Sequence, residues 1–227
     1  MNKIIDINNV NSYPKKLIEL FEKNSKDIDY DEIFKKYYFK CYHACNTYNI
    51  ENYKKYGIMR PYYVNRDGTK GINYDLKEIL LTPFKGYQNY DLYSKKYDEQ
   101  LEKEYERNKN LIHDWYGKYS CICYTLIKMD TNNPAYEPII SLYGGEIFRD
   151  IGISEKILEG LGKKCKSYII CFKLSYYEVQ EKCIYFPEVV EHMKKIYDNR
   201  KSNYRFENNI NKDIAPQDII DIIEVNR

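Results

Sequence analysis

The sequence predicts an α+β fold with a mainly antiparallel, split β-sheet and flanking helices. In the first half of the chain most segments are charged and have the spacing of amphipathic helices, whereas apolar, β-branched and aromatic runs typical of strands gather after residue 119. The 227 residues contain no internal repeat, no Pro-rich linker and no long block of like charge. We therefore expect one domain over residues 1–227, with a helical insertion around residues 74–113.

The segments before residue 74 are short and bounded by clear signals. Proline begins the first apolar stripe, Gly57 follows a helical pattern as glycine does at helix ends, and Asp-Gly and Lys-Gly pairs mark a turn region. The expected elements are a helix over 14–23, one or two helical turns over 31–37, a strand over 38–42, a helix over 49–56 and a loop or loose hairpin over 60–73.

The remaining segments alternate between helix and strand patterns. Pro83 ends one short helix, Ser154 is placed to cap another, and a proline opens the helix near residue 187. The longest helix, over 94–113, carries one apolar stripe made of Tyr97, Leu101, Tyr105 and Ile112. The other expected elements are helices over 74–81, 153–161 and 187–197, strands over 119–129, 138–143, 167–174 and 204–210, and a helical turn followed by a terminal strand over 216–225.

The composition excludes several classes of protein. The 36 Lys and Arg residues balance 34 Asp and Glu residues, so bulk charge gives no reason to expect a nucleic-acid binder. A mean hydropathy of −0.73 and the lack of a run of about eighteen apolar residues exclude a membrane-spanning protein. The first residues lack the apolar stretch of a signal peptide, so a cytoplasmic protein is expected. With 27 tyrosines, much of the core must be built from Tyr, whose hydroxyl needs a partner when buried.

The cysteines predict reduced thiols and no metal site. Their number, seven, is odd, and a structural zinc site usually shows two close Cys pairs, or one with a following His pair. Here the close pairs are Cys41 with Cys45 and Cys121 with Cys123. The second pair lies in an apolar run typical of a strand, where both thiols would face the same side.

Of the three histidines, His43 is the candidate for ligand binding. His113 and His192 lie on predicted helices and are expected to be structural or to face solvent. His43 ends the predicted strand and precedes a small residue, a turn and a helix, so its ring nitrogens are well placed to hydrogen-bond a ligand. The alternative is a half-buried histidine satisfied by the backbone.

Glu146 is the second candidate, because it directly follows two glycines at the end of a predicted strand. The glycines permit a sharp turn that would present a fixed carboxylate to a cleft. The alternative is a surface Glu that begins the next helix, where a negative charge also suits the helix dipole. The segment is not a phosphate-binding loop, since it lacks the lysine and the spacing of that motif.

Residues around His43 resemble a known family. Tyr42-His43-Ala44-Cys45, followed by 49–53 and by Tyr56-Gly57-Ile58, resembles the first motif of ADP-ribosyltransferases of the diphtheria-toxin and poly-ADP-ribose-polymerase lineage, a pattern that also opens RNA 2′-phosphotransferases and bacterial toxins. Ala44 stands where glycine is frequent, and Cys45 takes the Thr, Ser or Cys position. The resemblance covers about twenty residues, and the segment 216–225 resembles the last strand of such domains.

The resemblance implies NAD as a substrate, no metal, and a site that combines His, Tyr and Glu. His43 would bind the adenosine ribose, with Ala44, Cys45 and Gly57 beside it, and Glu146 would contact the nicotinamide ribose and orient the acceptor. Candidates for the Tyr that stacks on nicotinamide are Tyr87 and Tyr90, with Tyr93 and Tyr97 in the same gap. The second motif usual in the polymerases, Gly-x-Tyr-Phe-Ala, is absent, which leaves an inactive NAD-binding member as an alternative.

The function expected from the resemblance is an ADP-ribosyltransferase that uses NAD to modify a protein or nucleic acid in the cytosol, as a toxin, defence effector or phage-encoded modifier. The alternative is a non-catalytic phage or host-interaction protein that binds a partner protein or nucleotide through a Tyr-rich surface. A third interpretation, RNA processing, would need a basic patch such as Lys163, Lys164 and Lys166 beside the cleft.

Overall fold

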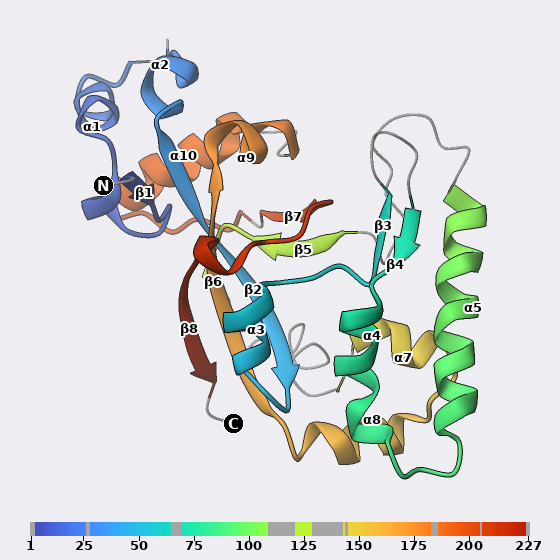
Figure 1. The fold of residues 1–227 in the computed structure, drawn as a ribbon. Helices are drawn as coiled ribbons and strands as arrows, with labels where there is room; N and C mark the ends of the chain where they lie inside the picture. Colours follow the sequence, from blue (N-terminus) through green and yellow to red (C-terminus); the bar gives the residue numbers. More distant parts are fainter. Residues whose placement is uncertain are drawn as a thin grey trace.

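A computed structural model describes residues 3–25, 28–64, 70–108, 121–128, 143, 145–182, 186–204 and 206–225. Within these residues, the predicted α+β class is confirmed: helices flank a mostly antiparallel six-stranded sheet, and a separate two-stranded hairpin lies near the helical insertion (Figure 1). Residues 138–142 of the predicted strand over 138–143, together with Ile112 and His113 of the predicted long helix, lie outside the described residues.

The elements follow one another along the whole chain. The strands are β1 (Lys3–Ile5), β2 (Tyr37–Thr47), β3 (Tyr62–Val64), β4 (Lys70–Ile72), β5 (Ile122–Thr125), β6 (Lys166–Ser175), β7 (Glu207–Ile210) and β8 (Ile219–Val225). The α-helices are α1 (Lys15–Glu22), α2 (Tyr30–Phe34), α3 (Glu51–Tyr56), α4 (Tyr74–Leu81), α5 (Tyr90–Asn108), α7 (Gly145–Asp150), α8 (Glu155–Gly162), α9 (Tyr176–Lys182) and α10 (Phe186–Tyr197). Short 3₁₀ turns are η1 (Val10–Ser12), η2 (Thr82–Phe84) and η3 (Pro216–Asp218).

Strand β2 organises the sheet, whose order is β7-β5-β2-β6-β8. One edge of β2 pairs with β6 along ten residues, from Tyr38 opposite Ser175 to Thr47 opposite Lys166. The other edge is divided, because β1 runs parallel to its first residues while β5 pairs with it only at Tyr42 opposite Thr125. Beyond Tyr42, β2 and β5 therefore diverge, and the sheet opens at this point (Figure 1).

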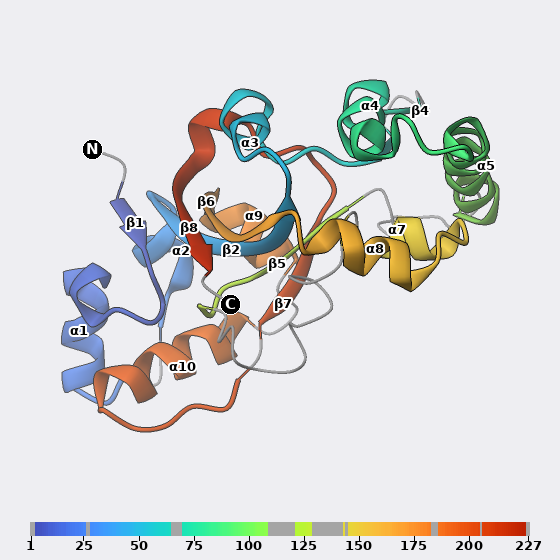
Figure 2. The same ribbon diagram turned by 90° about the horizontal axis from the view of Figure 1, so that it is seen from below.

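The first hydrophobic core lies on one face of this sheet. Because side chains alternate along a strand, Phe39, Cys41 and Cys45 of β2 enter the same cluster, which α1, α2, α9 and α10 complete. Phe34, Phe39, Tyr176 and Phe186 pack there as one group of aromatic rings, with centroids 5.2 to 5.9 Å apart. Figures 1 and 2 both show α1, α2 and α10 on the side of β2 away from the helical insertion.

The helical insertion builds a second core of its own with later helices. Tyr97 and Leu101 of the predicted stripe on α5 are fully buried there, and Tyr105 packs against them. Phe84 and Phe148 join the same cluster, with contributions from α4, α7 and α8. Helix α5 begins at Tyr90 rather than at residue 94, one turn earlier than the pattern predicts.

Tyrosine supplies much of the core, as the composition predicts, and the hydroxyls of Tyr42 and Tyr176 have carboxylate partners. The Tyr42 hydroxyl donates a hydrogen bond to Asp6 at 2.8 Å, and the Tyr176 hydroxyl donates to Asp31 at 2.8 Å. Burial, together with these hydrogen bonds to carboxylates, raises the pKa of both tyrosines. The two hydroxyls thus remain protonated donors, which is what burial of a phenol requires.

His192 is buried, which decides between the structural and the solvent-facing positions expected for it. It lies on α10 with 3% of its surface exposed, its Nδ1 hydrogen-bonded to the Ser202 hydroxyl at 2.8 Å and its ring edge-on to Phe206. Burial lowers the pKa of His192 from 6.5, and the nearby Lys195 lowers it further. The structural alternative is therefore correct for this histidine.

This burial predicts a loss of stability in mild acid. Because the unfolded chain takes up a proton near pH 6.5 and buried His192 does so only at lower pH, the stability contribution is complete above pH 6.5 and is lost as the pH falls toward the folded pKa. The slope per histidine is at most about 1.4 kcal/mol per pH unit. Urea denaturation at several pH values between 5 and 7.5 measures it.

A His192→Leu variant provides the control for this prediction. Carboxyl groups titrate near pH 4, below the window, and only His43, whose pKa is also lowered, contributes in the same direction among the described residues. The slope should therefore be smaller in the variant. An unchanged slope would show that His192 does not couple stability to pH.

Candidate functional site

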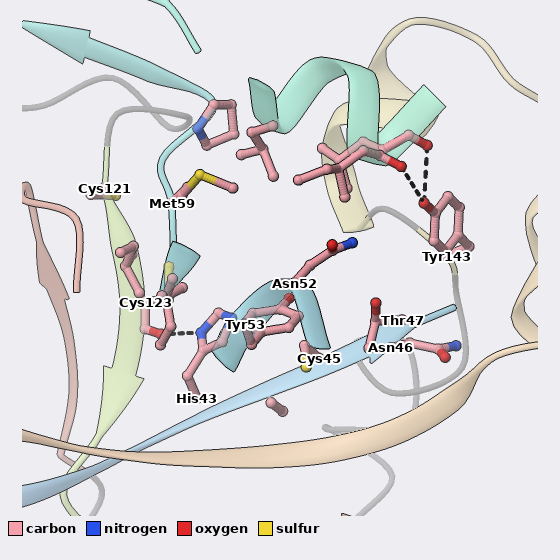
Figure 3. Close-up of a pocket in the computed structure, with 18 residues that line it drawn as sticks. His43, Cys45, Asn46, Thr47, Asn52, Tyr53, Met59, Cys121, Cys123 and Tyr143 are labelled. Atoms are coloured by element: carbon pink, nitrogen blue, oxygen red, sulfur yellow. Dashed lines mark hydrogen bonds between the residues drawn. The ribbon is translucent and has the colours of Figure 1, made fainter. Parts of the chain in front are cut away.

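A cavity of about 280 Å³ lies where β2 and β5 diverge. Its floor is formed by the last part of β2 and by α3, and its opposite wall by the apolar residues Leu76, Ile79 and Leu80 of α4 (Figure 3). The start of β5 closes one side. The cavity therefore joins the sheet to the helical insertion.

His43 lies at the β5 side of this cavity, and its tautomer follows from one hydrogen bond. Its Nδ1 is 2.9 Å from the backbone carbonyl of Cys123 (Figure 3). A carbonyl only accepts, so Nδ1 carries the proton and donates, which leaves Nε2 as an acceptor in the neutral ring. Burial lowers the pKa of His43 from 6.5, and the hydrogen bond to Cys123 opposes this effect without cancelling it. His43 is thus neutral at pH 7.

The structural reason for this position differs from the prediction. His43 does not end a strand, because β2 continues to Thr47 and His43 is paired with Ile170 of β6 inside the ladder. The opening beside it arises from the other edge, where β5 leaves β2 after one residue pair. A rigid strand interior, rather than a loop, therefore holds the imidazole.

Ala44, Cys45 and Tyr53 line the cavity next to His43. Burial raises the pKa of Cys45 to about 12, although a hydrogen bond donated by the Tyr53 hydroxyl opposes this effect. Cys45 is consequently a thiol at neutral pH and has no character of a nucleophile. Its role in the cavity is to fix the orientation of the Tyr53 ring.

Gly57 ends α3 and also lines the cavity, with φ at +80°. The next residue, Ile58, exchanges two backbone hydrogen bonds of 2.9 Å with Ile214, near the C-terminus. This bridge brings the backbone of Ile214 so close to Gly57 that a Cβ atom would lie 1.8 Å from the Ile214 carbonyl oxygen. The predicted helix-end glycine is therefore also required by a close approach of two chain segments.

The tyrosines at the cavity are not the ones predicted. Tyr87 is 41% exposed and contacts Phe84, and Tyr90 packs against the second core, and neither lines the described cavity. Tyr53 and Tyr143 line it instead. The Tyr143 hydroxyl points to the carbonyls of Leu80 and Ile79 at 3.0 and 3.4 Å (Figure 3), which ties the cavity to α4.

Glu146 lies in the first turn of α7, three residues after Tyr143. Ile147 and Phe148 are buried in the second core and anchor this helix. The predicted alternative of a Glu that begins a helix thus matches its backbone, while its side chain lies outside the described part of the structure.

Cys121 and Cys123 lie together at the β5 side of the cavity. A hydrogen bond between the two side chains raises the pKa of Cys121, and burial adds to the effect. Among the described residues, no group of three or more His, Cys, Asp or Glu side chains is arranged to hold a metal ion. Of the three lysines considered for an RNA-binding patch, Lys166 forms an ion pair with Glu224 at 2.8 Å.

In the part of the chain that the structure describes, no helix combines the length and apolar character needed to cross a membrane. The chain matches no known protein family, no curated protein and no solved structure.

Proposed function

We propose that the cavity binds NAD and that this protein transfers ADP-ribose from NAD to a macromolecule, either a protein or a nucleic acid. The observation that carries the proposal is the neutral ring of His43 at the cavity. Its Nδ1 donates a hydrogen bond to the Cys123 carbonyl, so its Nε2 remains an acceptor. A ribose hydroxyl is the complementary donor. The motif around His43, read from the sequence, leads to the same ligand.

The walls of the cavity suit a planar ring. Leu76, Ile79 and Leu80 offer an apolar surface, and Tyr53 and Tyr143 supply aromatic rings. At about 280 Å³ the cavity is near the lower end of the range for small-molecule pockets, so it would enclose one half of a dinucleotide. The remaining half would extend past the mouth of the cavity.

The reaction requires little covalent chemistry from the protein. The bond between the nicotinamide nitrogen and C1′ of the ribose breaks, and its electron pair leaves with nicotinamide. The cation-like ribose is then attacked at C1′ by a nucleophile of the acceptor, which loses its proton. A carboxylate stabilises the positive charge that develops, and Glu146 is proposed for this role because its helix follows directly after Tyr143, which lines the cavity.

Two substitutions test the proposal by separating binding from transfer. His43→Ala should weaken NAD binding roughly tenfold, because it removes one hydrogen bond to the ligand. Glu146→Gln should keep NAD binding and slow the release of nicotinamide by roughly a hundredfold, because it removes the stabilising charge. Calorimetric titration measures binding, and labelled NAD incubated with a cell lysate measures transfer. NAD that causes neither heat nor a shift in melting temperature would disprove the proposal.

Partner binding without catalysis is the second candidate, and the exposure of aromatic side chains near the cavity favours it. Tyr48 is 42% exposed and packs edge-on to Tyr143, and Tyr87 is 41% exposed on the adjoining Phe84. Tyrosine at a surface offers contact area at a low entropy cost. A protein that co-purifies at a fixed ratio, together with no response to any nucleotide, would favour this function.

A further inference from the structure

Asn52 places a carboxamide at the cavity that contributes no hydrogen bond to the fold among the described residues. It lies on α3, and Figure 3 shows its carboxamide pointing from this helix toward α4 across the cavity. Its carboxamide forms no hydrogen bond to another described residue, whereas its backbone N–H donates to the Asn49 carbonyl at 3.3 Å. One donor group and one acceptor oxygen thus face the ligand space.

Other asparagines of the chain show what a structural role looks like. The side-chain oxygens of Asn9, Asn49 and Asn73 accept backbone N–H groups two or three residues later, at 3.0 to 3.1 Å. Such local hydrogen bonds are the usual reason for asparagine at the start of a helix or turn. Asn52 lies in the first turn of the six-residue helix α3, yet its side chain forms no such bond to a described residue. The position therefore favours a role toward the ligand.

We infer that Asn52 determines the specificity of the cavity by pairing with a planar ring that presents an amino donor beside an acceptor. This inference rests on the proposed NAD-binding function. NAD carries two groups with such an edge, the carboxamide of nicotinamide and the amino edge of adenine, and an asparagine carboxamide complements either through two hydrogen bonds. The opposite wall is apolar at Leu76 and Leu80, so this wall offers no hydrogen bond in place of a lost pairing.

Two deaminated dinucleotides identify the edge that Asn52 reads. Nicotinic acid adenine dinucleotide replaces the amino group of the nicotinamide side, and nicotinamide hypoxanthine dinucleotide replaces that of the adenine side. We expect one of them to bind the wild-type protein roughly tenfold to a hundredfold more weakly than NAD, because an unpaired polar group in a pocket is costly. The weaker analogue names the half of NAD that the cavity encloses.

Variants of α3 assign this discrimination to Asn52. Asn52→Leu keeps the size of the side chain and suits a helix, so the fold should be retained, as thermal denaturation will show. In this variant NAD should bind as weakly as the discriminated analogue does. Lys54→Ala, which removes an exposed lysine paired with Glu51 on the same helix, should leave the discrimination unchanged.

The outcomes separate this inference from the proposed function. If the wild-type protein binds both analogues as tightly as it binds NAD, the role of Asn52 is disproved and the proposed function is not. The same holds if Asn52→Leu still binds NAD more tightly than the weaker analogue. If NAD does not bind the wild-type protein at all, the proposed function is disproved and the role of Asn52 with it.

Discussion

Replacement of Gly57 by alanine is expected to remove a large part of the stability of the protein. The added Cβ would lie 1.8 Å from the carbonyl oxygen of Ile214 and 3.0 Å from its carbonyl carbon, and these backbone atoms cannot rotate away as a side chain can. The positive φ of +80° adds strain for any residue with a Cβ. We expect a loss on the order of 3–5 kcal/mol in the free energy of unfolding, measured by urea denaturation. Proteins of this kind are stable by about 5–15 kcal/mol, so the effect is severe.

Two other glycines separate the clash from the backbone strain. Gly86 also has a positive φ, +99°, but nothing lies within 4 Å of its added Cβ, so Gly86→Ala should cost about 1–2 kcal/mol. Gly160 lies inside α8 with open space around it, so Gly160→Ala should stabilise the protein by about 0.5–1 kcal/mol. If Gly57→Ala costs no more than Gly86→Ala, the segment at Ile214 moves aside easily and does not hold the cavity.

Much of the fold was predictable because its signals are local. Helix α4 matches its predicted bounds, and β8 follows η3 as the terminal pattern indicates. Helix α9 lies between the predicted strand over 167–174 and the predicted helix over 187–197, in a segment for which no element was expected. A local signal was present, however: Glu178 accepts hydrogen bonds from both the backbone and the hydroxyl of Ser175 at 2.8 Å, a capping arrangement that the Ser-x-x-Glu spacing indicates.

The end of β2 could not be predicted from local patterns. Beyond Tyr42 the sequence turns to His, Ala, Cys and Asn, which favour strands weakly. The strand continues because β6, more than a hundred residues later, supplies an opposing residue in the antiparallel ladder for each position up to Thr47. Tertiary pairing here overrides propensity, and it places His43 inside the sheet.

The candidate site was predictable only where its residues lie close together in the sequence. The residues near His43 in sequence, Ala44, Cys45 and Gly57, line the cavity with it, because one strand and one short helix hold them together. The distant Tyr could not be found by spacing, since the path of the chain between α4 and α7 decides which ring returns to the cavity. Tyr143 does so, and its position depends on the second core.

This dependence predicts that Phe84→Ala will impair both stability and the cavity. Phe84 is fully buried, and its ring lies 5.2 Å from Phe148, 5.6 Å from Tyr93 and 6.2 Å from Tyr143. Loss of such a ring costs about 3–5 kcal/mol, because a cavity remains after the transfer of the side chain. Tyr143 and α4 lose their support at the same time, so any ligand affinity of the cavity should fall well below that of the wild type, as calorimetric titration under folding conditions will show.

Phe186→Ala is the matched control, because it removes an equivalent ring from the first core. Phe186 is 3% exposed and packs 5.6 Å from Phe34, 5.2 Å from Tyr176 and 5.7 Å from Phe39, none of which lines the cavity. Its loss should cost a similar free energy of unfolding, yet the molecules that remain folded should bind ligand as the wild type does. Equal losses of affinity in the two variants would show that the cavity responds to overall stability rather than to the second core. A loss of ligand affinity in Phe84→Ala alone instead means that the helical insertion forms the wall of the site. Substitutions inside the insertion would then change ligand binding even where the substituted residue does not contact the sheet.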